Sequence, residues 1–252
     1  MSLTINTTGL MNKENKKLIM FAGPSGIGKT TLAKGVEELY SSQSVDIPFI
    51  SGSVSDLVES TREMSHKDML NRDSMTLQME DYQILNLRKK KFSNQIASGK
   101  NFVCDRSFLD SAAYFIYKQA EVIAKCEVEH FLALSKLLSA NHCTHLILLD
   151  FTPNMIQEWV TENNNKRITN NYFQMEIARI MNMVLDLWGI RYTEDIFSLK
   201  GKNIFSVPTS LKYGAKRGII DSPYGKVNVL VIRESVKEIR EKLIERFIDG
   251  KI

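Results

Sequence analysis

Residues 18–31 read LIMFAGPSGIGKTT, and this stretch decides the fold. Its first five residues form an apolar run that ends at a Gly-Pro pair, which is typical of a strand buried on both faces. The next eight residues match the pattern G-x-x-x-x-G-K-S/T at every fixed position. Apolar residues then recur at helical spacing at Leu32, Val36 and Leu39. The stretch therefore predicts a strand, a glycine-rich turn and a helix.

A turn of this pattern binds phosphate groups for physical reasons. Successive backbone N–H groups must point inward at the β-phosphate, and a Cβ atom would obstruct that curl, so Gly23, Gly26 and Gly28 recur. Lys29 can then reach the β- and γ-phosphate oxygens, and the Thr30 hydroxyl can ligate magnesium. The positive end of the helix adds to the same site. The residues expected to bind ATP are Gly23, Pro24, Ser25, Gly26, Ile27, Gly28, Lys29, Thr30 and Thr31.

Composition indicates an ordinary globular protein. The chain has 252 residues, of which 43% are hydrophobic and 25% charged, so it can bury an α/β core without disulfides. A net charge of +4 is too mild to indicate a nucleic-acid coat, although it suits a phosphorylated ligand. Three cysteines in no metal-ligand spacing read as reduced core residues, which predicts a cytoplasmic location. No apolar run approaches the roughly 20 residues of a membrane span.

Further apolar runs at 101–104, 145–149 and 227–232 read as strands, and helical patterns lie between them. Strands that alternate with helices favour a parallel sheet with helices on both faces. We therefore predict an α/β P-loop NTPase fold with a five-stranded parallel sheet.

The chain also divides by composition. Residues 1–16 are polar and without a sustained period, so we predict a flexible N-terminal tail. Residues 17–252 are expected to form a single domain. Within it, we predict a mainly helical acceptor cap at 41–100 and a lid at 160–171.

Two acidic residues follow predicted strands and compete for the metal. Asp105 ends the strand at 101–104, and Asp150 ends the one at 145–149. Because the carboxyl ends of parallel strands line the ligand crevice, either aspartate can approach the acceptor or, together with Thr30, the magnesium ion. Motor and remodelling ATPases usually carry Asp-Glu at the second position, where the Glu positions a water, whereas here Phe151 follows Asp150. The pattern therefore disfavours a hydrolase.

Thr31 either contacts the α-phosphate or only begins the helix.

The segment Asp105-Arg106-Ser107, before a helix that holds Asp110 and Tyr114, resembles the Asp/Glu-Arg-Ser segment of P-loop nucleoside and nucleotide kinases. It is similar in particular to the ribosylnicotinamide-kinase-like small P-loop ATPases of bacteria and phages. The resemblance covers about residues 17–40 and 101–116. It implies that Asp105 is a general base or magnesium ligand and that Arg106 clamps acceptor or phosphate oxygens. A structural ion pair between the two is the alternative, and a plain helix cap is the alternative for Asp110.

The resemblance also implies a mobile lid that closes arginines over the phosphates. Lys166 and Arg167 lie in a polar stretch of suitable composition, so Arg167 is a candidate catalytic residue, and Arg179 is a possible later contributor. A plain solvated loop is the alternative.

Acceptor recognition is expected from the insertion after the first helix. Candidates there are Ser51, Gly52, Ser53, Arg62, Glu63, Asp81, Tyr82 and Gln83, each of which can equally be an ordinary helix or loop residue. The run Arg88-Lys89-Lys90-Lys91 covers all directions of one helical turn, so it is either a solvated surface or an attractor of a polyanion. Lys212, Lys216 and Arg217 are predicted to lie in a loop before the last strand.

The pattern as a whole predicts an ATP-dependent kinase that uses magnesium and transfers the γ-phosphoryl group to a hydroxyl or phosphate of a nucleoside or nucleotide. Two alternatives stay open. One is a kinase acting on nucleic acid or on a modified base in DNA, and the other is a non-catalytic or slow ATPase switch that regulates a partner protein. The sequence predicts no structural metal and no membrane partner, and it leaves the acceptor, the choice of ATP over GTP and the oligomeric state open.

Overall fold

A computed structural model describes residues 16–57, 73–119, 123–151, 171–195, 214–234 and 236–252 of the chain. Of the predicted tail at 1–16, residues 1–15 lie outside these ranges. So do residues 160–170 of the predicted lid at 160–171, with Lys166 and Arg167, and the acceptor candidates Arg62 and Glu63. No helix in the described ranges is both long and apolar enough to cross a bilayer.

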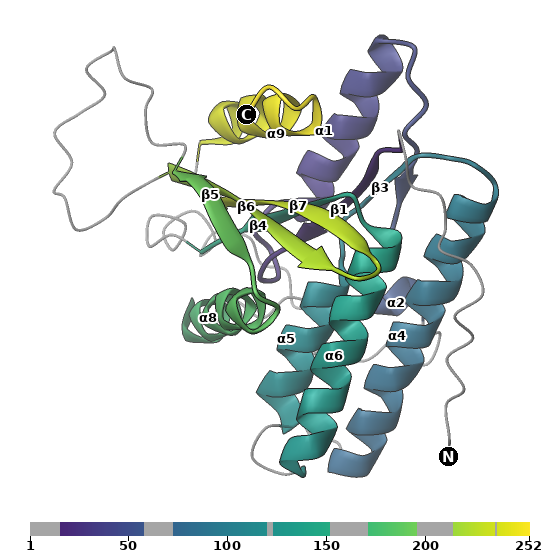
Figure 1. The fold of residues 1–252 in the computed structure, drawn as a ribbon, viewed down its shortest axis with the longest axis vertical. Coiled ribbons are helices and arrows are strands. Elements are labelled where there is room, and N and C mark those ends of the chain that lie inside the picture. The colour runs from purple at the N-terminus through teal and green to yellow at the C-terminus, as the bar shows by residue number, and fades with distance from the viewer. Residues whose placement is uncertain (1–15, 58–72, 120–122, 152–170, 196–213, 235) are drawn as a thin grey trace, which may run out of the picture.

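A seven-stranded sheet forms the centre of the fold, in the order β2-β3-β1-β4-β7-β6-β5 (Figure 1). Its strands are β1 (Leu18–Ala22), β2 (Phe49–Ile50), β3 (Phe102–Cys104), β4 (His145–Leu149), β5 (Arg191–Asp195), β6 (Gly214–Ser222) and β7 (Gly225–Arg233). The first five strands in the spatial order run parallel to one another. The last two, β6 and β5, are antiparallel.

The prediction of a five-stranded parallel sheet therefore needs a correction. Five strands are parallel, but the sheet is mixed and has seven strands. The hairpin of β6 and β7 turns at Pro223 and Tyr224, and Gly225 provides the positive φ of 138° that follows them. Lys216 and Arg217, which we expected in a loop, lie on β6.

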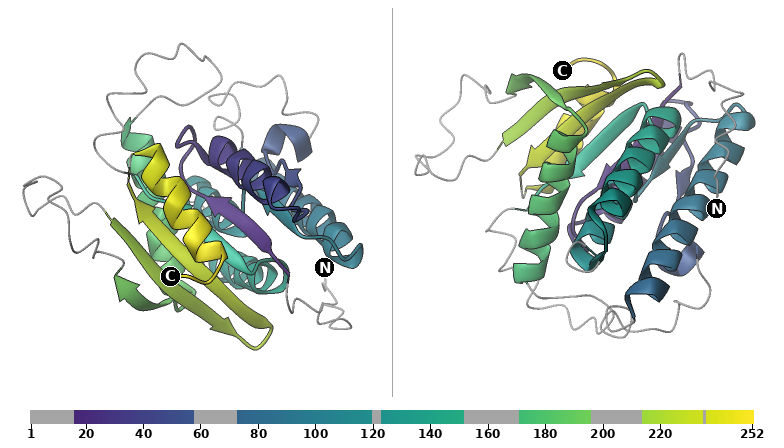
Figure 2. Two further views of the ribbon diagram at one scale, coloured as in Figure 1. Left: turned by 90° about the horizontal axis from the view of Figure 1, so that it is seen from above. Right: turned by 60° about the horizontal axis from the view of Figure 1, so that its bottom comes forward.

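Helices cover both faces of the sheet (Figure 2). One face carries α1 (Lys29–Ser42) and α9 (Lys237–Ile248). The other face carries α4 (Ser74–Ala97), α5 (Phe108–Gln119), α6 (Lys125–His142) and α8 (Asn171–Leu187), and the short α2 (Val54–Leu57) precedes α4. The long α4 packs against α5 and α6 and buries Leu85, Phe92 and Ile96 in the shared core.

The residues of β1 show why two layers of helices form. All five are fully buried. Ile19 and Phe21 pack in the core beneath α1 and α9, whereas Leu18, Met20 and Ala22 pack in the core beneath the other helices. A strand in this position is apolar throughout because both of its faces are covered.

The chain turns to opposite faces of the sheet after β1 and after β3, so the carboxyl ends of these two strands form a topological switch point, where the ligand crevice of such folds lies. It leaves β1 for α1 on one face and leaves β3 for α5 on the opposite face, although the two strands are neighbours in the sheet. Ligands bind at such a switch point, outside the carboxyl ends of the strands. This topology places the loop Gly23–Lys29 beside Asp105.

Candidate functional site

The glycine-rich loop has the backbone that its sequence requires. Gly23 has a φ of 146°, and a Cβ atom there would lie 2.6 Å from the carbonyl oxygen of Leu149 on β4. Gly28 has a φ of 91° at the N-cap of α1, in the left-handed region that disfavours other residues. The loop can therefore turn tightly between β1 and α1 with its amides near the positive end of the helix.

The side chain of Lys29 folds back over this loop. It is 4% exposed, and its Nζ donates hydrogen bonds of 2.6 Å to the carbonyl oxygens of Gly23 and Pro24. These contacts hold the ammonium group at the mouth of the loop. A lysine in this place is positioned to reach phosphate oxygens that the loop amides bind.

A buried arginine from the C-terminal helix supports the loop from behind. Arg240 on α9 is 6% exposed, and its Nη1 donates to the carbonyl oxygen of Ile27 at 3.1 Å. Its Nε donates to the carbonyl oxygen of Glu234. Sequence reasoning missed this residue. Its sequence position could have revealed it. Arg240 lies at helical spacing from Ile244 and Phe247, so it falls on the buried face of an amphipathic helix.

Asp105 connects the loop to the segment that follows β2. Its Oδ2 accepts a hydrogen bond of 2.6 Å from the Thr30 hydroxyl, and its Oδ1 accepts one of 2.9 Å from the backbone N–H of Gly52. The residue is 5% exposed. The crevice therefore holds a hydroxyl and a carboxylate in direct contact at the first turn of α1.

The residues after Asp105 form the start of α5. The Ser107 hydroxyl oxygen accepts from the N–H groups of Leu109 and Asp110, and the Asp110 carboxylate accepts from the N–H and hydroxyl of Ser107. This is a reciprocal cap with an aspartate at the third helical position. The structure therefore shows Asp110 in the capping role.

Asp110 also holds Arg106 at the edge of the crevice. Nη1 of Arg106 lies 3.4 Å from Oδ1 of Asp110, and the arginine side chain is 23% exposed. Burial alone would lower the pKa of Arg106, but Asp110, Tyr114 and Asp105 together raise it above the ordinary value. The guanidinium is thus a fixed cation beside the loop.

Tyr114 reaches the same loop from α5. Burial raises the pKa of its hydroxyl to about 12, against the opposing effects of Arg106 and of a backbone hydrogen bond from Ser25. The phenol therefore stays protonated at neutral pH. It offers a neutral hydroxyl next to the phosphate loop.

Asp150, the second acidic strand end, has different partners. Its Oδ2 accepts from Nε of Arg233 at 2.6 Å, and its Oδ1 accepts from the N–H of Phe151 at 2.8 Å. Of the two aspartates, the one that the structure brings into contact with Thr30 is Asp105.

Two of the predicted acceptor residues lie among the helices. Asp81 on α4 is buried in an ion pair with Lys118 on α5. Tyr82 packs edge-on against Phe131 of α6, with the ring centroids 5.1 Å apart. Both have an evident role in holding α4 to its neighbouring helices.

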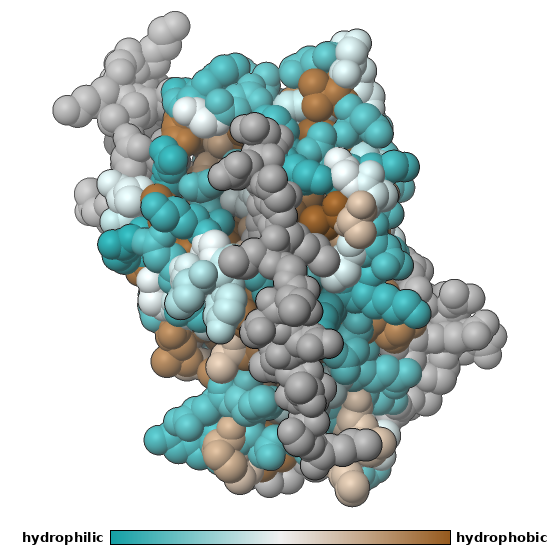
Figure 3. Space-filling view, turned by 45° about the vertical axis from the view of Figure 1, so that its right-hand side comes forward, coloured by the Kyte–Doolittle hydropathy of each residue, from teal (hydrophilic) through white to brown (hydrophobic). Residues whose placement is uncertain are grey.

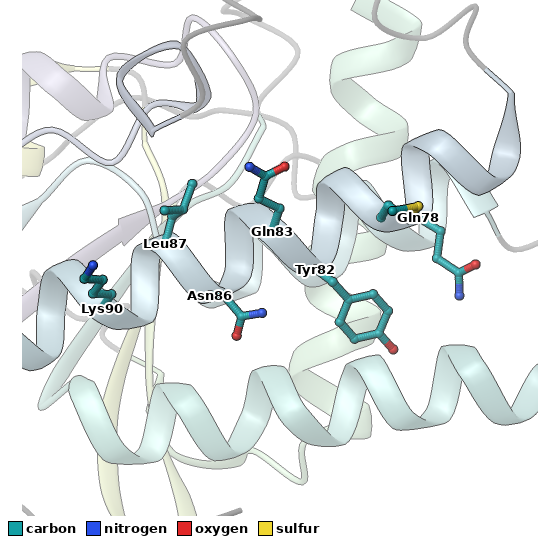
Figure 4. Close-up of a pocket in the computed structure, with 7 residues that line it drawn as sticks. Gln78, Tyr82, Gln83, Asn86, Leu87 and Lys90 are labelled. Carbon is teal, nitrogen blue, oxygen red and sulfur yellow. The ribbon is translucent and has the colours of Figure 1, made fainter. Parts of the chain in front are cut away.

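Gln83 lines a hollow of about 540 Å³ along α4 (Figure 4). The described residues that line this hollow all belong to α4 and are Gln78, Met79, Tyr82, Gln83, Asn86, Leu87 and Lys90. None of them belongs to the phosphate loop or to the Asp105 segment, so this hollow and the crevice have no residue in common.

The basic run on α4 differs from the prediction of a solvated surface. Arg88 is 2% exposed, and Lys91 donates from Nζ to the carbonyl oxygen of Ser51 at 2.7 Å. Only Lys89 and Lys90 of the run are exposed. The run is therefore not a solvated surface on all sides, because one side of this helical turn faces Gly52 and α5.

On the face of the molecule shown in Figure 3, hydrophilic residues cover most of the coloured surface.

Together, the loop, its lysine and the crevice beside β1 define a P-loop nucleotide-binding α/β domain. A comparison with family models agrees with this class, because the AAA domain model matches residues 18–200, most of the chain. The chain belongs to the AAA domain family of P-loop ATPases. No curated protein matches the sequence.

Proposed function

We propose that this protein is a phosphotransferase that uses magnesium and ATP and phosphorylates a small nucleoside-like acceptor. Membership of a P-loop ATPase family supports nucleotide binding and ATP turnover. The observation that carries the finer proposal is the contact of Thr30 with Asp105, beside which Arg106 lies at the edge of the crevice.

The residues present fit magnesium. The Thr30 hydroxyl and the Asp105 carboxylate offer oxygen atoms 2.6 Å apart, and oxygen is the ligand that magnesium prefers. Two such protein ligands are enough, because magnesium keeps several of its waters. Among the described residues no larger cluster of potential metal ligands occurs. When bound, the ion supplies charge neutralisation at the β- and γ-phosphates.

Each chain residue then has a role. The amides of residues 23–30 and the Lys29 ammonium bind the β- and γ-phosphates. Asp105 accepts one hydrogen bond at each carboxylate oxygen, and each oxygen keeps a further lone pair. Its contact with Thr30 favours a role on the metal side of the site, and removal of the acceptor proton by the same carboxylate is the alternative. Arg106 stabilises the negative charge that spreads over the transferring phosphoryl group. We extend the proposal to Arg167 as a lid residue on the strength of the family resemblance alone.

The same strand ends favour transfer over hydrolysis. Arg106 follows Asp105 and Phe151 follows Asp150, so neither strand end carries the glutamate that commonly positions a water. The nucleic-acid alternative rested on the basic run of α4. Because Arg88 and Lys91 are turned toward protein carbonyl groups, this run gives it little support.

The test is to incubate the protein with magnesium and ATP and a panel of nucleosides, nucleotides, ribosylnicotinamide and DNA oligomers. Mass spectrometry reports which acceptor gains a phosphate, and coupled detection of ADP reports hydrolysis. A nucleoside or nucleotide that gains one phosphate in step with ADP release supports the proposal. The proposal is contradicted if the rate of ADP release is the same with and without every acceptor, or if DNA alone gains a phosphate.

A further inference from the structure

The buried guanidinium of Arg88 joins three segments around the candidate site. From the middle of α4, Nη1 donates to the Ser107 carbonyl oxygen at 2.9 Å and to the Ser111 hydroxyl at the start of α5. Nη2 donates to the Gly52 carbonyl oxygen at 2.9 Å. A guanidinium offers its donors in a rigid planar fork, so these bonds fix the Gly52 segment relative to α5.

Gly52 carries this restraint to Asp105. Its N–H donates to Oδ1 of Asp105 at 2.9 Å, while Oδ2 of the same carboxylate accepts from Thr30. A Cβ atom at Gly52 would lie 2.7 Å from both Cβ of Arg106 and Sγ of Cys104, so the backbone is packed directly onto the end of β3. The backbone of Gly52 therefore connects two sets of hydrogen bonds: Arg88 binds its carbonyl group, and its N–H binds Asp105, which in turn accepts from Thr30.

The neighbouring carbonyl group is held in the same way. Lys91, one turn further along α4, donates to the carbonyl oxygen of Ser51 at 2.7 Å. Two successive carbonyl groups are thus bound by cations of one helix. This arrangement leaves the peptide between Ser51 and Gly52 little freedom to rotate, and that peptide supplies the N–H that orients Asp105.

Packing alone does not account for a buried cation here. Burial lowers the pKa of Arg88, and the nearby charge of Asp110 offsets only part of that effect. Leu85 and Phe92 already provide apolar contact on the buried side of α4. A buried charge is weak evidence for stability, so the three hydrogen bonds that Arg88 makes are better explained by a role in fixing the geometry of the segments that it joins.

We propose that Arg88 is a positioning residue for the metal side of the ATP site. It holds the carbonyl group of Gly52 and thereby fixes the same residue, whose N–H keeps the Asp105 carboxylate in the orientation that meets Thr30. This inference rests on the proposed binding of magnesium and ATP, but not on the identity of the acceptor.

The test is calorimetric titration of the full chain with ATP, with and without magnesium chloride. The variants are Arg88→Lys, which keeps the charge but lacks the fork, and Lys89→Met as an exposed control on the same helix. We expect ATP affinity without metal to change by less than about threefold in both. The gain in affinity on adding magnesium should fall about tenfold in Arg88→Lys, as for other residues that orient metal ligands. It should be unchanged in Lys89→Met.

An unchanged magnesium effect in folded Arg88→Lys overturns the inference. So does an additive loss when Arg88→Lys is combined with Asp105→Asn, because a residue that acts through Asp105 adds nothing once that carboxylate is gone. Should Arg88→Lys fail to fold, Ser111→Ala removes one anchor of the fork and should reduce the magnesium effect by about threefold; no reduction overturns the inference. Wild-type protein that binds no ATP refutes the proposed function, and this inference with it.

Discussion

The Thr30 hydroxyl donates a hydrogen bond of 2.6 Å to Oδ2 of Asp105, although the two residues are 75 positions apart in the chain. The contact exists because β3 lies directly beside β1 in the sheet, so the residue after β3 meets the first turn of α1. On the other side of β1, Asp150 is paired with Arg233 instead. The two strand ends are therefore not equivalent, and each can be tested by the same chemical change.

Asp105→Asn should remove turnover while leaving ATP affinity without metal nearly unchanged. The amide keeps the size of the side chain but loses the negative charge with which a carboxylate attracts magnesium. We expect turnover to fall at least about a hundredfold, a larger effect than the usual loss of a residue that only orients a metal ligand. The measurement is ADP release at several magnesium concentrations, with ATP affinity determined by calorimetry.

Asp150→Asn is the matched control. It weakens the ion pair with Arg233, whose side chain is 49% exposed, so solvent screening keeps the expected loss of stability to about 1 kcal/mol. Urea unfolding measures that loss, and turnover should stay close to wild type. If Asp150→Asn lost turnover and Asp105→Asn kept it, Asp150 rather than Asp105 would serve the metal.

Lys29→Ala should abolish turnover and weaken the binding of ATP with magnesium at least about tenfold, because the loop loses the ammonium group that reaches the phosphates. Lys34→Ala changes an exposed lysine on the same helix and should leave both quantities unchanged. Calorimetry and ADP release provide the measurements. Wild-type turnover in a folded Lys29→Ala protein would refute nucleotide binding at this loop.

The phosphate loop was predictable because its chemistry is local. Phosphate binding by backbone amides needs glycines and a lysine at fixed spacing, and the positive φ angles of Gly26 and Gly28 follow from that need. The strand before the loop and the helix after it were also correct. All of these features are encoded within about twenty consecutive residues.

The contacts by which α4 holds the segment beside the phosphate loop were not predictable from the sequence. Arg88 and Lys91 belong to a basic run whose sequence alone suggests a solvated surface. Their partners Gly52 and Ser51 are 36 and 40 positions away in the chain. Only the folded chain shows that one side of this helical turn faces carbonyl groups. The strand β6 was missed because its segment was interpreted as a glycine-containing loop. Lys216 and Arg217 are neighbours in the strand and therefore point to opposite faces of the sheet, where both are half-buried.

The ion pair of Asp81 and Lys118 should hold α4 against α5 rather than recognise an acceptor. Lys118→Met alone leaves the buried Asp81 carboxylate without its ion-pair partner and should lower the free energy of unfolding by about 3 kcal/mol. The double change of Asp81→Leu with Lys118→Met should recover most of that loss. Urea unfolding measures both. Turnover of the double variant should match wild type, and a selective rise in the KM of the acceptor would place Asp81 in the acceptor site instead.

His145 should make the protein less stable in mild acid. Burial, Lys17 and Arg217 lower the pKa of its imidazole to about 4 in the folded state, from an ordinary value of about 6.5. Between these values the unfolded chain binds a proton that the folded chain does not, so stability is lost as the pH falls from 6.5 toward 4.

At pH 5 the loss from His145 should amount to about 2 kcal/mol relative to pH 7.5. The measurement is urea unfolding of the wild type and of His145→Asn at both pH values. Asn keeps a polar atom near the Thr144 hydroxyl, which lies 2.9 Å from Nδ1 of His145, but it cannot take up a proton. The decrease in stability between the two pH values should be smaller in the variant by about that amount. An equal decrease in both proteins would show that His145 is protonated as easily in the folded state as in the unfolded chain.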